Sequence, residues 1–147
     1  MPQKPTAVIS FVDRFNFNRD KLLEETLRIP VAFTQIGPGQ TELQIPAFIP
    51  TEAIKAPAHT LQIEFCISAV ALRLNNDNIF GNENLTITLP YNESMQAARN
   101  ILLLLQTEAG NILIVALQIR YATRIGLQFK YLAPAKCPAA IVAAVYL

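Results

Sequence analysis

The sequence is poor in the residues from which most catalytic and metal sites are built. It has no tryptophan, one histidine and two cysteines in 147 residues. A serine or cysteine hydrolase mechanism would have to use His59, which precedes a strand pattern in the segment APAHT, and no G-x-S-x-G turn is present. A structural zinc site takes about four ligands, and His59, Cys66 and Cys137 are too few and lack paired spacing. We therefore predict that the protein is not an enzyme and has no catalytic residue, metal or cofactor.

Charged residues are also scarce, and they are unevenly placed. They make up 16% of the chain, against about 25% in average soluble domains. The 12 basic and 11 acidic residues give a net charge of +1, and residues 13–28 alone hold eight of these 23 charges. This balance provides no electrostatic footprint for nucleic acid or anionic lipid. A near-neutral, weakly charged surface favours association, so the composition indicates an assembly subunit, with a neutral monomer as the alternative.

The most apolar stretch is too interrupted to cross a membrane as a helix. A helical span takes about 20 apolar residues, whereas Glu108 separates the apolar runs 101–105 and 112–119. Gly110 and Asn111 tolerate positive φ and favour a turn. We therefore predict no membrane span, and a hairpin formed by residues 101–105 and 112–122. The segment MPQKPTAVIS shows no signal-peptide pattern, so the location is not predicted, although an assembling subunit suits an extracellular or cell-surface setting.

Short segments with alternating apolar and polar residues recur along the chain and predict β-strands. In residues 60–74, for example, Ile63, Phe65 and Ile67 share one face, and Gln62 and Glu64 lie on the other. A helix pattern competes with the strand pattern in residues 19–28 alone. Residues 51–55 also fit one helical turn. Strands of this length and spacing are typical of an all-β fold, here an antiparallel β-sandwich of the immunoglobulin-like or Greek-key type. We predict a single domain over residues 1–147 with at most one short helix. The nine predicted strands are residues 6–12, 27–36, 41–49, 60–74, 85–90, 101–105, 112–122, 127–132 and 141–147.

Two local features leave alternatives open. Cys66 lies inside a strand pattern and Cys137 in a loop pattern, and two free thiols are favoured over one disulfide. The Asn-rich run 75–84 supplies oxygen atoms that could bind calcium, but it lacks the EF-hand pattern and holds only two anionic residues. Because Asn readily adopts turn conformations, we interpret this run as a connecting loop.

The segment QIPAFIPTEAIKAPAHT resembles a family of small uncharacterised bacterial β proteins, together with the long strand, Asn-rich turn, LTITLP, short connection, apolar hairpin and terminal apolar strand that follow it. The resemblance covers residues 27–147. It implies an all-β fold and no assigned enzymatic activity, and it carries over no site residues.

Two functions fit these observations. The first is a structural protein that self-assembles into a homo-oligomer, such as a filament, surface layer or virus-like particle, and is joined through apolar strands. The second is a monomeric adhesion or binding module that recognises a glycan or protein through its loops. The candidate interface residues for the first are Ile101, Leu103, Leu105, Ile141, Val142, Val145, Tyr146 and Leu147, and the candidate loop contacts for the second are Asn78, Asn82 and Tyr91.

Overall fold

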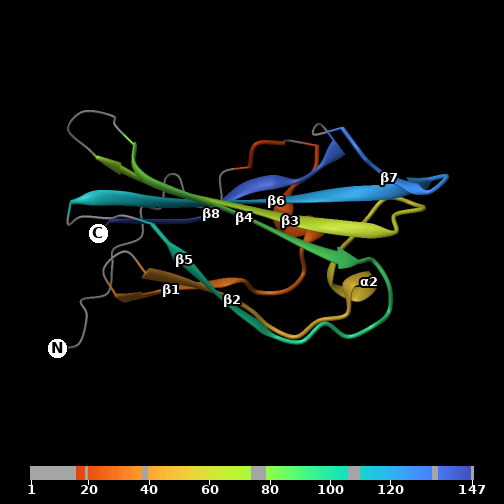
Figure 1. Cartoon of the computed structure of the whole chain (residues 1–147), viewed down its shortest axis with the longest axis horizontal. Coiled ribbons are helices and arrows are strands. Elements are labelled where there is room, and N and C mark those ends of the chain that lie inside the picture. The colour runs from red at the N-terminus through yellow and green to blue at the C-terminus, as the bar shows by residue number, and fades with distance from the viewer. Residues whose placement is uncertain are drawn as a thin grey trace.

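The computed structural model describes residues 16–18, 20–37, 40–73, 79–105, 110–133 and 136–146, and these residues form two antiparallel sheets packed face to face (Figure 1). The all-β sandwich predicted from the sequence is confirmed. Within the described ranges there are eight strands instead of nine, because the predicted strand 6–12 lies outside them. The elements are α1 (Leu23–Thr26), β1 (Ala32–Gly37), β2 (Gln40–Ile45), α2 (Pro50–Ala53), β3 (Gln62–Arg73), β4 (Ile79–Pro90), β5 (Arg99–Leu104), β6 (Asn111–Ile125), β7 (Gln128–Tyr131) and β8 (Ala139–Tyr146).

The larger sheet is built around β3 and β6. β4 pairs with β3, and β3 pairs with β6 along twelve residues, from Gln62↔Ala122 to Arg73↔Asn111. The other edge of β6 is divided between two strands, since β8 pairs with residues 112–118 and β7 with residues 122–125. β6 can serve all three neighbours because it is 15 residues long.

The core lies between this sheet and the smaller sheet, whose order is β1-β2-β5. The alternation in β3 places Ile63, Phe65 and Ile67 inward, each at most 2% exposed. Leu43 on β2 and Leu103 on β5 face them from the smaller sheet, each 1% exposed. Burying large aliphatic and aromatic side chains is the main driving force for this fold.

The predicted hairpin between residues 101–105 and 112–122 is wrong. β5 pairs with β2, whereas β6 pairs with β3, so the chain passes from one sheet to the other between them. Gly110 has a φ of +90°, as the turn chemistry predicts, but a change of direction suits a crossing between sheets as well as a hairpin. The smaller sheet needs β5 because Leu103 and Leu105 complete the apolar layer begun by Leu43 and Ile45.

Several strand boundaries also differ from the prediction. The Asn-rich run is only partly a connection, because β4 begins at Ile79 and pairs with β3 as far as Leu72. A two-residue hairpin turn joins β6 to β7 between Ile125 and Gln128, and Gly126 supplies the positive φ of +62° that the turn requires.

The described part of the chain contains two four-residue helices, one more than predicted. α2 forms because Pro50 fixes the helical φ at its first turn, and the Ile54 N–H donates to the Pro50 carbonyl at 3.0 Å. Within the described ranges, no helix is long and apolar enough to cross a membrane.

Candidate functional site

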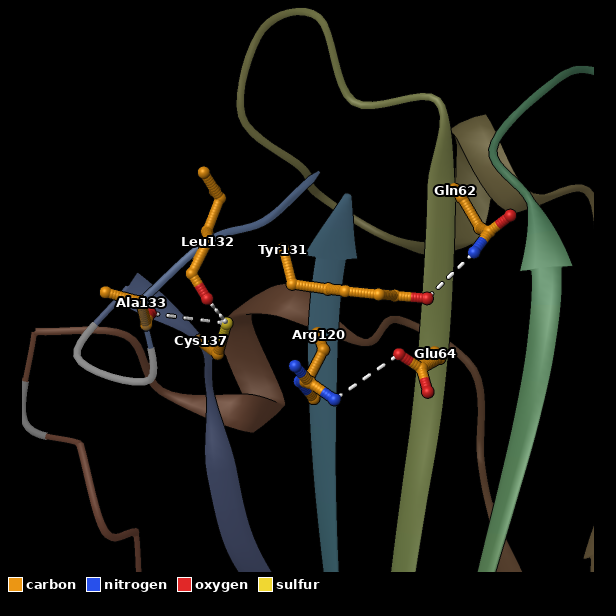
Figure 2. Close-up of polar contacts among 7 residues, drawn as sticks. All are labelled: Gln62, Glu64, Arg120, Tyr131, Leu132, Ala133 and Cys137. Atoms are coloured by element: carbon orange, nitrogen blue, oxygen red, sulfur yellow. Dashed lines mark hydrogen bonds and ion pairs between the residues drawn. The ribbon is translucent and has the colours of Figure 1, made fainter. Parts of the chain in front are cut away.

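The most connected group of polar side chains lies on the outer face of the larger sheet (Figure 2). Glu64 on β3 stands directly opposite Arg120 on β6, and Tyr131 on β7 reaches across β6 toward β3. Gln62 and Cys66 flank Glu64 on the same face of β3, because residues two apart along a strand share a face. We call Gln62, Glu64, Cys66, Arg120 and Tyr131 the outer-face network.

Arg120 is the central residue of this network. Its Nη1 lies 3.5 Å from Oε2 of Glu64, and its guanidinium carbon lies 4.4 Å from the centroid of the Tyr131 ring. The Glu64 side chain is 11% exposed and that of Arg120 is 38% exposed. A carboxylate this buried needs a cation beside it, so Arg120 neutralises Glu64 while the Tyr131 ring holds the guanidinium in place.

Tyr131 and Cys66 are both held in their neutral forms. Burial raises the pKa of Tyr131, and the Glu64 carboxylate raises it further. The hydrogen bond of 2.8 Å that the Tyr131 hydroxyl accepts from Nε2 of Gln62 partly opposes this rise in pKa. Burial likewise raises the pKa of the Cys66 thiol, with Glu64 adding to the rise and Arg120 partly opposing it. A thiol with a raised pKa is a poor nucleophile, so Cys66 is not activated for covalent chemistry.

The two cysteines do not belong to a shared site. Both are free, as the sequence favours: Cys66 lies on the outer face, whereas Cys137 is 1% exposed. The Cys137 thiol points toward the carbonyl oxygens of Leu132 and Ala133, at 4.0 and 3.6 Å (Figure 2). Among the described residues, no group of three or more His, Cys, Asp or Glu side chains could hold a metal ion.

A second feature is an apolar groove of about 530 Å³ beside β8. One wall comes from α1 and the segment that follows it, including Leu23, Leu27 and Val31. The other wall comes from β6 and β8, including Ile141 and Val142. Among the described residues that line it, Glu24 alone is charged, so this lining offers contact area and little directional recognition.

The predicted interface residues of β5 face the core. Leu103 and Leu105 are 1% and 6% exposed, and Ile101 packs against the same cluster. The leucines open to solvent on β5 are Leu102, at 46% exposed, and Leu104, at 56%. Because all five residues of ILLLL are apolar, the alternation pattern cannot indicate which of them face inward. The pairing of β5 with β2 decides which residues of β5 face the core, because Ile101 is paired with Leu43 and shares its face.

The predicted interface residues of β8 lie within the larger sheet of the chain itself. Ile141 and Val142 are partly buried and line the apolar groove. The backbones of Val145 and Tyr146 pair with Leu113 and Ile112 of β6. Leu147 lies outside the described residues.

The candidate loop contacts do not come together in one loop. Asn82 belongs to β4, where it pairs with Val70. The Tyr91 hydroxyl donates to the Ile54 carbonyl at 2.6 Å, and its ring packs against the core. Asn78 lies outside the described residues.

Comparisons with known proteins add no family to this description. No family model, curated protein or solved structure matches the chain.

Proposed function

We propose that this protein is a non-enzymatic structural subunit that self-assembles through the β5 edge of its smaller sheet. The observation that carries the proposal is the pair Leu102 and Leu104, which are 46% and 56% exposed on a strand at the edge of a sheet. The low charge of the chain supports it, since few ionic groups would have to be desolvated on association.

An edge strand of this kind is suited to pairing with another strand. Natural proteins protect sheet edges with charged side chains, proline or bulges. β4, an edge of the larger sheet, has Asn82, Glu83 and Asn84 in its sequence. β5 has the sequence RNILLL, in which Arg99 is the only charged residue. Among the strands described, β5 has a partner only on the β2 side.

The most economical contact is antiparallel addition of β5 to β5 of a second copy about a two-fold axis. It would join two three-stranded sheets into one of six strands and place the exposed leucines of both copies on one face. A two-fold contact closes on itself, so a filament or layer needs a second contact. The apolar groove beside β8, with Ile141 and Val142, supplies a surface for it.

The register of the smaller sheet provides a matched pair of variants to test this. Glu42 lies between Thr34 on β1 and Leu102 on β5, and all three occupy one cross-strand row. Leu102→Lys and Thr34→Lys therefore add the same charge beside the same carboxylate, at opposite edges of the sheet. Both variants are expected to fold, because each new lysine is exposed and faces Glu42.

We expect the wild-type protein to elute as a multimer in size-exclusion chromatography with light scattering, and to show regular particles in negative-stain microscopy. Leu102→Lys should convert it to a monomer or to a smaller oligomer, whereas Thr34→Lys should leave the assembly unchanged. A wild-type protein that is monomeric at high concentration would contradict the proposal. So would a Leu102→Lys variant that assembles normally.

A further inference from the structure

The tip of the β6–β7 hairpin carries three exposed apolar side chains. Ile125, Leu127 and Phe129 are 60%, 91% and 48% exposed. They occur within five consecutive residues around the turn at Gly126, at the right-hand end of the molecule in Figure 1. We call Ile125, Leu127 and Phe129 the hairpin tip. The core uses none of them, and they are separate from the exposed leucines of β5.

The hairpin tip projects beyond the sandwich. β3 accompanies β6 only as far as Ala122, which pairs with Gln62, and residues 123–125 continue with β7 alone. At about 3.3 Å per residue, this two-stranded ribbon extends about 10 Å past the end of β3. Ile125 and Phe129 lie on opposite faces of this ribbon, since Ile125 is paired with Gln128 and Phe129 with Arg124, so the ribbon would enter a bilayer with its tip first. Membrane-binding elements bury their apolar groups about 5–10 Å into the headgroup and acyl boundary, and the projection matches that depth.

The polar groups of the turn are compatible with an apolar surrounding. The Arg124 side chain donates from Nε to the Gly126 carbonyl at 2.9 Å, which satisfies an acceptor at the end of the hairpin. The paired residues from Ala122↔Tyr131 to Ile125↔Gln128 form a ladder between the two strands. A segment that enters a bilayer interface must satisfy its backbone groups in this way, because each unsatisfied group is costly there.

The charged side chains within the hairpin itself are of one sign. Arg124 and Lys130 flank it and are exposed, and residues 109–147 contain no aspartate or glutamate. On the outer face nearer the body of the sheet, Glu64 is paired with Arg120. The chain as a whole is nearly neutral, so this cationic character is local to the hairpin.

From these observations we propose that the hairpin tip docks on the surface of an anionic lipid bilayer. Leu127 enters the interface with Ile125 and Phe129 beside it, and Arg124 and Lys130 contact lipid phosphates. A convex, narrow tip buries little area against a rigid protein surface, whereas a fluid bilayer closes around it. Cationic side chains on a hairpin that lacks acids complement the negative surface potential of such a bilayer. This contact is independent of the β5 edge.

Co-sedimentation of the full-length protein with vesicles tests the proposal. The vesicles are phosphatidylcholine alone or phosphatidylcholine mixed with phosphatidylglycerol. We expect the wild-type protein to bind the mixed vesicles, and to bind them less as salt is added. Leu127→Ser should weaken binding at least tenfold, and Lys130→Gln about fivefold. Serine after glycine suits this turn, so Leu127→Ser should keep the fold, as circular dichroism can verify.

Met95→Ser is the matched control, because Met95 is 63% exposed and lies outside the hairpin. It should bind vesicles like the wild-type protein. Three outcomes would overturn the proposal: no binding by the wild-type protein, unchanged binding by Leu127→Ser, or an equal loss with Met95→Ser. A Leu127→Ser variant that alters the oligomer without altering vesicle binding would assign the tip to a protein contact instead.

Discussion

The alternation of buried and exposed leucines in β5 leads to a sharp prediction for two adjacent substitutions. Leu103 is 1% exposed and belongs to the core, whereas Leu102 is 46% exposed on the outer face. Leu103→Ala removes three carbons from the core, which costs about 2.4 kcal/mol at about 0.8 kcal/mol per buried carbon. The cavity left behind raises the loss to about 3–4 kcal/mol. Leu102→Ala leaves no enclosed cavity, so its cost should be below about 1 kcal/mol.

Urea denaturation followed by far-ultraviolet circular dichroism can measure both effects, since the chain has no tryptophan to serve as a fluorescent probe. A loss of about 3 kcal/mol corresponds to a fall in Tm of about 6–12 °C for a chain of this size. The free energy of unfolding should be compared at two protein concentrations. If β5 also joins copies, the cost of Leu102→Ala will grow with protein concentration, whereas that of Leu103→Ala will not.

Equal losses for the two variants, independent of concentration, would refute the placement of Leu103 inside and Leu102 outside. A larger loss for Leu102→Ala at low concentration would refute it more strongly, because it would show that the strand presents its other face to the core.

Two further predictions concern single residues elsewhere in the sandwich. Because the pKa of Cys66 is raised, its alkylation by iodoacetamide should reach half of its maximal rate above pH 9.0, the ordinary value for a thiol, and Glu64→Gln should shift this midpoint to lower pH. The stability that depends on the neutral Cys66 thiol should accordingly be complete below the pKa of this thiol in the unfolded chain, and it should be lost as the pH rises through the pKa in the folded state. Cys137 is 1% exposed, so iodoacetamide should alkylate it only on unfolding. His59 has a φ of +68°, so His59→Gly should stabilise the protein by about 0.5–1 kcal/mol by relieving the left-handed conformation, whereas His59→Ala should give no gain in thermal denaturation.

The sequence predicts strands well where one face is apolar and the other polar. The alternation around Ile63, Phe65 and Ile67 identifies β3, and the same pattern identifies most of β6. It could not identify the partner of β5, because ILLLL is apolar on both faces and its pairing with β2 depends on residues about 60 positions earlier in the chain. The turn chemistry at Gly110 therefore predicts a hairpin, although the chain crosses between sheets there.

The contacts of the outer-face network could not be predicted from the local sequence pattern either. The pattern places Glu64 in mid-strand on a solvent or interface face, but its contact with Arg120 spans 56 positions and follows from the register of β3 against β6. The sequence does contain a signal for the β6–β7 hairpin: Gly126 stands between two alternating segments, where a two-residue turn requires a positive φ.

The divided edge of β6 has a consequence for the order in which the protein forms during synthesis. Residues 112–118 of β6 find their second neighbour only in β8, which is the last strand to leave the ribosome of those described. Until then, the apolar sequence NILIVALQ has one open edge, of the kind that recruits other chains. Nascent chains of this protein are therefore expected to depend on chaperones until β8 has emerged, and a ribosome that pauses between β6 and β8 would favour aggregation over folding.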